Sequence, residues 1–153
     1  MSSAAECDEF RDLVLRIAHE KQSHYYYSAE LPATPVAADP TKRTLTVRTT
    51  LTSAELTGSG CIDEGVAATV ADYWTSALLT AVHGGKSSVT TSLSVQAPRR
   101  VAPGTPVDVV CSALDHCGSR DMPCATALFV AAEDHLQVFA VATHTKYFKP
   151  LRK

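Results

Sequence analysis

The sequence predicts an α+β fold in which a curved antiparallel sheet wraps around one long helix. Three observations lead to this prediction: an apolar run with helical spacing over residues 62–82, an alternating strand pattern from Thr44, and further strand patterns after the apolar run. A helix that is apolar around most of its circumference has to be buried, and consecutive strands with short connections pair antiparallel. At 153 residues and 45% hydrophobic content, the chain has enough apolar side chains for one such core.

Residues 62–82 form the predicted central helix. Large apolar side chains recur there at helical spacing, and alanines fill much of the remaining circumference. They are Ile62, Val66, Val70, Trp74, Leu78, Leu79 and Val82, with Ala67, Ala71, Ala77 and Ala81. A narrow polar strip interrupts this apolar surface, and its members are Thr69, Asp72, Thr75, Ser76 and Thr80. Asp72 is the single carboxylate of the strip.

Residues 1–43 are predicted to hold a short helix followed by an irregular connection. Ser3 and Glu6 have the spacing of a capping box in front of an amphipathic pattern that runs to about Glu20. Three tyrosines follow at 25–27, and three prolines then break any regular element between them, at Pro32, Pro35 and Pro40. We interpret the tyrosines as cover for one end of the core in preference to a ligand lid.

Residues 44–153 are predicted to form the main domain. Its first strand alternates from Thr44 to roughly Leu56, and residues 57–60 are a loop that leads into the helix. Gly84 and Gly85 end the helix in the manner of a glycine C-cap. The later strands are expected at residues 89–96, 107–114, 124–132 and 136–148.

Charge and composition exclude several classes of function. The formal net charge is −2 and the basic residues are scattered, so the electrostatic footprint of a nucleic-acid-binding protein is missing. No apolar run is both unbroken and long enough to span a bilayer. The acidic start of the chain, residues 1–9, is unlike a secretory or transit peptide. We therefore expect a soluble cytoplasmic protein without a membrane span.

The five cysteines fit reduced thiols better than a disulfide framework, because their number is odd and their spacing irregular. Zinc is the poorer interpretation. His116, Cys117, Cys111 and Cys124 lie near one another in the sequence, but the close paired spacing of structural zinc sites is absent. No metal is expected.

One segment resembles a known family. The run Gly60-Cys61-Ile62-Asp63-Glu64-Gly65 leads into a small-residue helix with an acid at Asp72. This is similar to the pattern of hotdog-fold acyl-CoA thioesterases of the phenylacetate-pathway and 4-hydroxybenzoyl-CoA type, which have a His-Gly-Gly start, a small apolar helix and an acidic residue two turns in. Residues 94–100 and 143–146 resemble further parts of that family, and the match covers roughly residues 44–148.

The resemblance implies hydrolysis of acyl-CoA thioesters to a free acid and CoA, in lipid metabolism. Asp72 would be the base or nucleophile, the amides of Glu64 and Gly65 would form the oxyanion hole, and Thr90 would orient the water. Thr57 stands where relatives carry an Asn or Gln. No cofactor is implied, since CoA is part of the substrate.

Substrate-binding residues follow from the same resemblance. CoA's phosphates need cations, for which Arg99, Arg100 and Lys146 are candidates, with surface solubility as the rival interpretation. Trp74 would contribute to the floor of the acyl pocket.

A homodimer or homotetramer is expected for two reasons. Asp72 lies eight residues after Glu64, about 12 Å along a helix, so one helix cannot present both to the same carbonyl, whereas two antiparallel helices across a twofold axis can. In a monomer the polar strip would also leave the helix half wet, that is, exposed to solvent along this strip.

Departures from the family pattern keep an alternative open. The His-Gly-Gly start is replaced by Asp63-Glu64-Gly65, which puts a carboxylate at the oxyanion-hole position, and Thr57 is shorter than an Asn or Gln. Glu64 as the base is one alternative, and Asp72 as an ordinary solvated helix residue is another. The rival function is a catalytically weak or inactive hotdog dimer that binds acyl-CoA or a protein partner. Hydratase chemistry is disfavoured because the helix lacks the His-containing arrangement that hydratases of this fold use.

Overall fold

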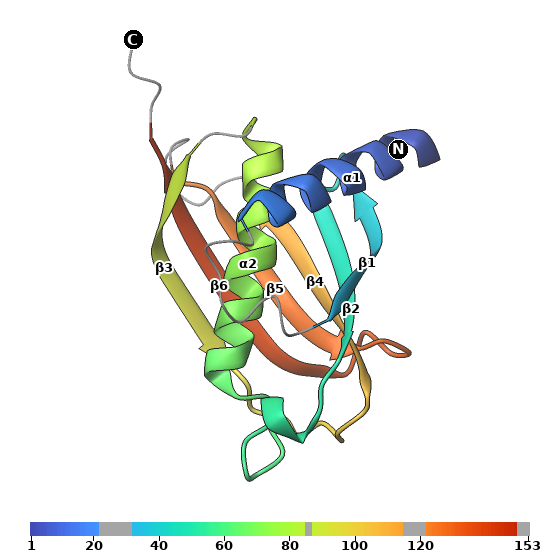
Figure 1. The fold of residues 1–153 in the computed structure, drawn as a ribbon, viewed down its shortest axis with the longest axis vertical. Helices are drawn as coiled ribbons and strands as arrows, with labels where there is room; N and C mark the ends of the chain where they lie inside the picture. Colours follow the sequence, from blue (N-terminus) through green and yellow to red (C-terminus); the bar gives the residue numbers. More distant parts are fainter. Residues whose placement is uncertain (22–31, 85–86, 115–121, 150–153) are drawn as a thin grey trace.

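The computed structural model describes residues 1–21, 32–84, 87–114 and 122–149, and in these residues one antiparallel sheet curves around a long helix (Figure 1). The described elements are α1 (Ala4–Lys21), β1 (Ala33–Asp39), β2 (Thr44–Thr50), a 3₁₀ turn (Ser53–Glu55), α2 (Glu64–Val82), β3 (Ser88–Gln96), β4 (Pro106–Leu114), β5 (Cys124–Ala131) and β6 (Val138–Phe148). The predicted fold class is confirmed. No helix in this part of the chain is long and apolar enough to cross a membrane.

The strand order separates β2 and β3, the two strands that flank α2 in the sequence. The order is β1-β2-β4-β5-β6-β3, and every neighbouring pair is antiparallel. The helix follows β2 and leads to β3, so it crosses the concave face of the sheet on its way to the far edge (Figure 1). As a result β3 lies beside the last strand, β6, although some 50 residues separate them in the sequence.

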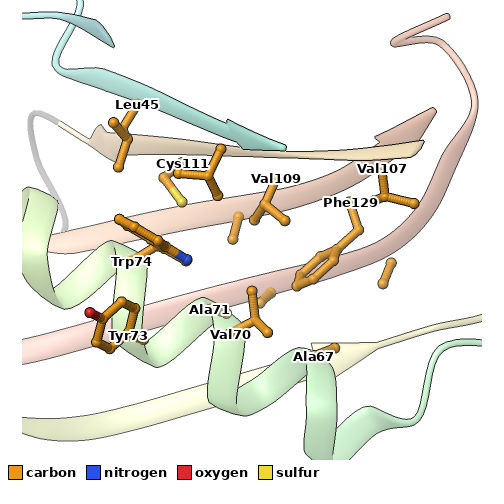
Figure 2. Close-up of a cluster of buried hydrophobic side chains, with 14 of the residues drawn as sticks. Leu45, Ala67, Val70, Ala71, Tyr73, Trp74, Val107, Val109, Cys111 and Phe129 are labelled. Atoms are coloured by element: carbon orange, nitrogen blue, oxygen red, sulfur yellow. The ribbon is translucent and has the colours of Figure 1, made fainter. Parts of the chain in front are cut away.

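The core lies between α2 and the concave face of the sheet. Val70, Ala71 and Trp74 of the helix lie against Val109 of β4 and Phe129 of β5 (Figure 2). The helix alanines Ala67, Ala71 and Ala77 are fully buried. Because alanine side chains are short, they let the helix backbone approach the sheet closely, and larger residues on either side fill the remaining space.

The N-terminal helix packs on α2 and β1. Val14 of α1 is fully buried, and the Tyr73 hydroxyl donates a hydrogen bond to the Ala18 carbonyl at 2.9 Å. The predicted capping box is confirmed: the Ser3 amide donates to the Glu6 carboxylate at 2.7 Å, and the Glu6 amide donates to the Ser3 hydroxyl at 3.3 Å. The bonds from Ser3 lower the pKa of Glu6.

The irregular connection predicted before Thr44 is wrong for residues 33–39, which form the edge strand β1. Pro35 is accommodated because β1 pairs only with β2 and its register shifts between Pro35 and Ala37. An edge position with a bulge is where a strand tolerates proline. The tyrosines at 25–27 lie outside the described residues.

Two boundaries around the central helix also differ from prediction. Strand β2 ends at Thr50, and the chain then makes the 3₁₀ turn instead of continuing extended to Leu56. The helix begins at Glu64 with Asp63 as its N-cap, two residues later than the apolar pattern indicates. The predicted first turn was too early because Ile62 is buried as part of the incoming loop.

Candidate functional site

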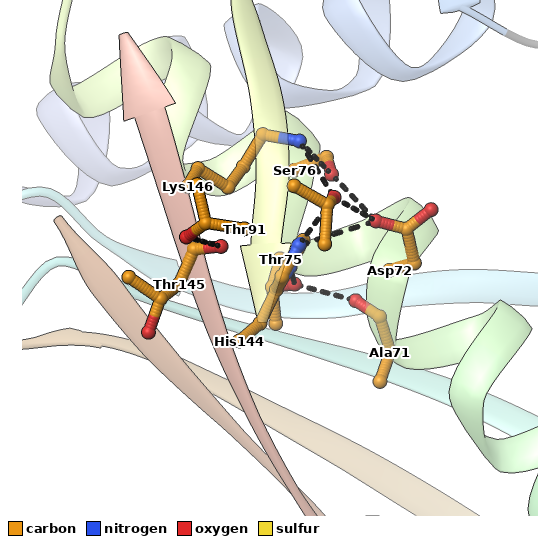
Figure 3. A network of polar contacts seen from close by, with 9 residues as sticks. Ala71, Asp72, Thr75, Ser76, Thr91, His144, Thr145 and Lys146 are labelled. Atoms are coloured by element: carbon orange, nitrogen blue, oxygen red, sulfur yellow. Dashed lines mark hydrogen bonds and ion pairs between the residues drawn. The ribbon is translucent and has the colours of Figure 1, made fainter. Parts of the chain in front are cut away.

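Asp72 lies on the side of α2 that faces β3 and β6, and its side chain is 21% exposed. Its Oδ1 atom accepts hydrogen bonds from the Ser76 hydroxyl at 3.2 Å and from the Thr90 hydroxyl at 3.3 Å. The Nε2 atom of His144 lies 3.3 Å from the same oxygen (Figure 3). The interpretation of Asp72 as an ordinary solvated helix residue is therefore wrong.

Three of the five members of the polar strip of α2 are buried inside the chain. Thr75, Ser76 and Thr80 are between 0% and 4% exposed. The Thr75 hydroxyl donates to the Ala71 carbonyl at 2.6 Å and contacts His144, while Ser76 contacts Lys146. For these three residues the prediction that the strip would be half wet in a monomer is wrong, and side chains of β6 cover Thr75 and Ser76.

Helix and sheet geometry explain why these residues meet. Positions 72, 75 and 76 are three and four residues apart and so lie on one face of the helix. On the sheet, Thr90 of β3 pairs with Lys146 of β6, and Leu93 pairs with His144. Directly paired residues point to the same face of a sheet. A register shift between Thr90 and Ser92 lets Thr90 and Leu93 both face the helix, although they are an odd number of residues apart.

His144 and Lys146 complete the cluster, and neither was predicted to lie beside Asp72. His144 is 1% exposed; its Nδ1 lies 2.7 Å from the Thr75 hydroxyl oxygen and its Nε2 lies 2.8 Å from that of Thr90. Lys146 is 4% exposed and donates from Nζ to Ser76 at 3.0 Å and to Thr90 at 3.4 Å. Burial lowers the pKa of Lys146, and the negative charge of Asp72 opposes that shift.

A sequence signal for these two residues did exist. In β6 the even-numbered positions Ala140, Ala142 and Phe148 are buried apolar residues, so the strand alternation puts positions 144 and 146 on the inner face too. Polar side chains at buried positions need hydrogen-bond partners, and the polar strip of α2 supplies them.

The N-terminus of α2 is closed by its own cap. Oδ1 of Asp63 accepts hydrogen bonds from the amides of Gly65 at 2.9 Å and Val66 at 3.1 Å. A Cβ atom at position 65 would meet that oxygen at 3.0 Å, so the glycine makes room for the cap. In this structure the Gly65 amide, which was predicted to be an oxyanion donor, is bound to the Asp63 carboxylate. Glu64 is exposed in the first turn.

Thr57 lies in the exposed loop before α2. Its hydroxyl is 2.9 Å from that of Ser59 and donates to the Cys61 carbonyl at 3.3 Å. The Cys61 amide in turn donates to the Thr57 hydroxyl at 3.3 Å. Of the predicted catalytic residues, the structure brings Thr90 to Asp72, whereas Glu64, Gly65 and Thr57 belong to the other end of the helix.

The predicted phosphate-binding residues are not brought together. Arg99 and Arg100 are exposed beyond the end of β3, where Arg100 forms a β-bridge with Cys61. Lys146 pairs with Thr90, six residues or about 20 Å before the end of β3, and is buried. An open hollow of about 440 Å³ beside Arg100 is also lined by Glu133 and Asp134, whose carboxylates would repel a phosphate.

Trp74, which was predicted to contribute to the floor of the acyl pocket, belongs to the hydrophobic core. Its ring is 7% exposed and packs edge-on to Tyr73, with ring centroids 5.0 Å apart, in the core between α2 and the sheet (Figure 2). Substitution of Trp74 would therefore act first on the core.

Metal ligation finds no support in the residues that the structure describes. No group of three or more His, Cys, Asp or Glu side chains in them is arranged to hold a metal ion. Cys7, Cys61 and Cys111 are free thiols, and burial raises the pKa of Cys111 to about 12. His116 and Cys117 lie outside the described residues.

No protein-family model matches the chain, and no curated protein matches it. Solved structures do. The E. coli PaaI protein from the phenylacetic acid degradation operon superposes with a TM-score of 0.71 at 15% identity, over 92% of this chain and 96% of that one. Zebra fish thioesterase superfamily member 2 gives 0.72 at 14% identity, over 91% and 95%. A hypothetical thioesterase with coenzyme A from Streptococcus pneumoniae gives 0.67 at 14% identity, over 92% and 99%.

These matches cover nearly all of each chain. The chain has the hotdog fold of these thioesterases, as the sequence resemblance implied. At identities this low the likeness concerns the fold, and the chemistry has to be argued from the side chains around Asp72.

Proposed function

We propose that this chain is an acyl-CoA thioesterase, which hydrolyses its substrate to a free acid and CoA. The observation that carries the proposal is Asp72, a partly exposed carboxylate on the central helix that two hydroxyls and a buried histidine hold in place. A neighbour of the same fold solved with coenzyme A supports CoA as part of the substrate.

In the proposed reaction a water oxygen attacks the thioester carbonyl carbon. Asp72 takes a proton from that water as the C–O bond forms, and the C–S bond then breaks to release the CoA thiolate, which takes up a proton. Ser76 donates to Oδ1 of Asp72 and the Thr90 hydroxyl lies 3.3 Å from the same oxygen, so both hold the carboxylate in place before substrate arrives. Thr90 thus orients the base in this proposal, as well as any water bound to it.

The carbonyl oxygen needs hydrogen-bond donors as it becomes an oxyanion. We assign this role to the first-turn amides of Glu64 and Gly65, where the positive end of the helix dipole adds to the donors. To donate to the oxyanion, the Gly65 amide has to break its hydrogen bond with the Asp63 carboxylate. Thr57 likewise has to break its hydrogen bond with Ser59 to take part. Both rearrangements are local to the loop that precedes the helix.

A homodimer, or a homotetramer built from it, belongs to the proposal. Asp72 and the N-terminus of α2 are about 12 Å apart along one helix, so a site that uses both needs the N-terminus of a second copy. β3 offers the contact: it is an edge strand of nine residues, and most of them are exposed. An unpaired edge of that length is a template for pairing with another strand.

A second candidate is a hotdog dimer that binds acyl-CoA or a protein partner without turnover. The Asp63 cap favours it, because a carboxylate occupies the amide that hydrolysis would need. The two candidates share the fold and the ligand, and they differ in whether CoA thiol is released.

Incubation of the purified protein with an acyl-CoA chain-length series and a thiol reagent separates them. The thioesterase releases CoA in proportion to enzyme, and Asp72→Asn removes that release while acyl-CoA binding, measured by calorimetry, stays. Binding with release at background in the parent protein contradicts the thioesterase and supports the second candidate.

A further inference from the structure

The hydroxyl of Thr75 fixes which nitrogen of His144 carries a proton. A threonine hydroxyl has one proton, and Thr75 gives it to the Ala71 carbonyl in a bond of 2.6 Å. Its oxygen can therefore only accept from His144 Nδ1, 2.7 Å away, so Nδ1 carries a proton. In the neutral imidazole Nε2 is then an acceptor, and it faces Thr90 and Asp72.

Lys146 restricts the neighbouring hydroxyls in the same way. Its ammonium has donors only, so the oxygens of Ser76 and Thr90 accept from it at 3.0 and 3.4 Å. The Ser76 proton then goes to Asp72 at 3.2 Å. The Thr90 proton has two possible acceptors, His144 Nε2 at 2.8 Å and Asp72 Oδ1 at 3.3 Å.

Two hydrogen-bond patterns therefore fit one set of atomic positions. With His144 neutral, Thr90 donates to Nε2, and Nε2 and Oδ1 face each other as two acceptors 3.3 Å apart. With His144 protonated on both nitrogens, Nε2 donates to Thr90, Thr90 donates to Asp72, and the acceptor pair becomes an attractive ion pair. The second pattern satisfies every contact in the cluster, so the site is built to receive one proton on His144.

We propose that His144 is the final acceptor of the proton that Asp72 takes from the attacking water, and that Thr90 carries it there. The proton on Asp72 moves to the Thr90 oxygen while the Thr90 proton moves to Nε2. Asp72 is left as a carboxylate that accepts from Thr90, and His144 is left as an imidazolium. The reverse transfer returns the proton through Asp72 to the CoA thiolate. This inference rests on the proposed thioester hydrolysis, and it makes His144 a positioning residue, because it acts through Asp72.

The charges around His144 agree with this direction of transfer. In the part of the chain that the structure describes, the cluster places Asp72 of α2 and Lys146 of its own strand near it, and the residues paired with it on β3 and β5, Leu93 and Ala125, are apolar. Asp72 and Lys146 offset each other before the reaction. When a proton neutralises Asp72, transfer of that proton to His144 makes Asp72 a carboxylate again. The carboxylate is then near two cations, Lys146 and the His144 imidazolium.

Nitrogen-15 NMR of the histidine side chains tests the proton positions without any turnover. We assign the His144 signals from their loss in His144→Gln. We expect the neutral ring to be protonated on Nδ1, and we expect the midpoint of its titration to fall by at least about one pH unit in Asp72→Asn, because the anionic partner is gone. Protonation on Nε2 alone in the neutral ring, or an unchanged midpoint, would overturn the relay even if the protein proves to be an active thioesterase.

Steady-state kinetics of variants provides the second test. His144→Gln and Thr75→Val should each lower kcat by about tenfold or more at neutral pH, with KM nearly unchanged. The acid limb of the kcat profile should move to lower pH in His144→Gln, where Asp72 alone takes the proton. Thr75→Val keeps the volume of the side chain and serves if His144→Gln fails to fold. His135→Gln is the control, since His135 also contacts a buried carboxylate, Asp108, outside the site.

The outcomes separate the two proposals. Parent turnover with the same acid limb in His144→Gln and in the parent overturns the relay and leaves the thioesterase intact. No parent turnover contradicts the thioesterase, and the NMR arm then decides alone whether Asp72, Thr90 and His144 share a proton.

Discussion

The Arg48 guanidinium holds the Asp108 carboxylate with two hydrogen bonds, from Nε to Oδ1 at 2.8 Å and from Nη2 to Oδ2 at 3.0 Å. The two residues are direct cross-strand partners on β2 and β4, and Nε2 of His135 lies 2.9 Å from Oδ2. The bonds from Arg48 are the main cause that lowers the pKa of Asp108; the His135 contact acts in the same direction, and burial opposes both.

Because the pKa of Asp108 is lowered in the folded protein, its ionisation stabilises the fold. The pair stabilises the fold above the pKa of an unfolded aspartate, about 3.9, and that contribution is lost as the pH falls through the lower folded value. We expect Asp108→Asn to lower the free energy of unfolding at pH 7 by about 1 kcal/mol, since solvent screens the half-exposed Arg48. Urea unfolding measures it. A difference from the parent that is as large at pH 2 as at pH 7 would show that the charge plays no part.

The Asp72 carboxylate gives the sharpest test of the proposed chemistry. Asp72→Asn is nearly isosteric, so folding and acyl-CoA binding should persist while kcat falls by about 10²-fold or more. Steady-state kinetics with thiol detection measures the loss. Asp134→Asn is a suitable control because Asp134 is an exposed carboxylate in the turn before β6. Equal turnover in Asp72→Asn and the parent would mean that another group is the base.

The Asp63 cap sets up a competition between helix stability and catalysis. Asp63→Ala should cost about 1 kcal/mol of stability, as the loss of an N-cap usually does. The same change frees the Gly65 amide, so kcat should rise if that amide serves the oxyanion. Ser3→Ala removes the N-terminal cap of α1 at a similar cost and should leave kcat unchanged. A fall in kcat for Asp63→Ala alone would indicate that the cap itself holds the site together.

Glu64→Gly puts a glycine at the second position of the His-Gly-Gly pattern that the sequence resembles, and it keeps the backbone donor. Improved turnover, followed by the same thiol assay, is expected if the carboxylate repels the developing oxyanion. Loss as severe as in Asp72→Asn would instead make Glu64 a catalytic group.

Substitutions of the arginines beyond β3 and of the buried lysine should change different kinetic constants. Arg99→Ala with Arg100→Ala should raise KM for acyl-CoA by about tenfold at low salt, and less at high salt, if they contact its phosphates. Lys146→Met should lower kcat with little effect on KM, because Lys146 contacts Ser76 and Thr90. Lys42→Ala, another exposed cation, is the control. An unchanged KM in the double variant at low salt excludes the phosphate role.

Assembly through β3 predicts an asymmetry between the two edges of the sheet. Val89 on β3 and Val36 on β1 are similarly exposed, at 46% and 43%. A lysine on an edge strand discourages pairing, so Val89→Lys should weaken self-association by about tenfold or more, whereas Val36→Lys should not. Sedimentation measures both. A parent protein that sediments as a folded 16.3 kDa monomer at micromolar concentration excludes a site shared between subunits.

The sequence was sufficient for features that periodicity controls. The helix, the strands after it and the position of Asp72 follow from spacing, and the capping box at Ser3 and Glu6 is local chemistry. β1 was missed because Pro35 usually breaks a strand, and only the edge position and bulge make it acceptable. His144 was missed as a partner of Asp72 because their contact depends on which strand lies beside β3, and strand order is a tertiary property.

The register shift in β3 has a consequence for changes in chain length. Across it, β3 advances two residues, from Thr90 to Ser92, while β6 moves only from Lys146 to Thr145. The strand therefore carries one residue more than its partner needs. The extra residue lies next to an identical one, because positions 90 and 91 are both threonine. Deletion of Thr90 or of Thr91 yields the same shortened chain, with a threonine still opposite Lys146 and Leu93 still opposite His144. A one-residue deletion in β3 outside residues 90–92 has no such spare position and would turn the residues on one side of it to the other face of the sheet.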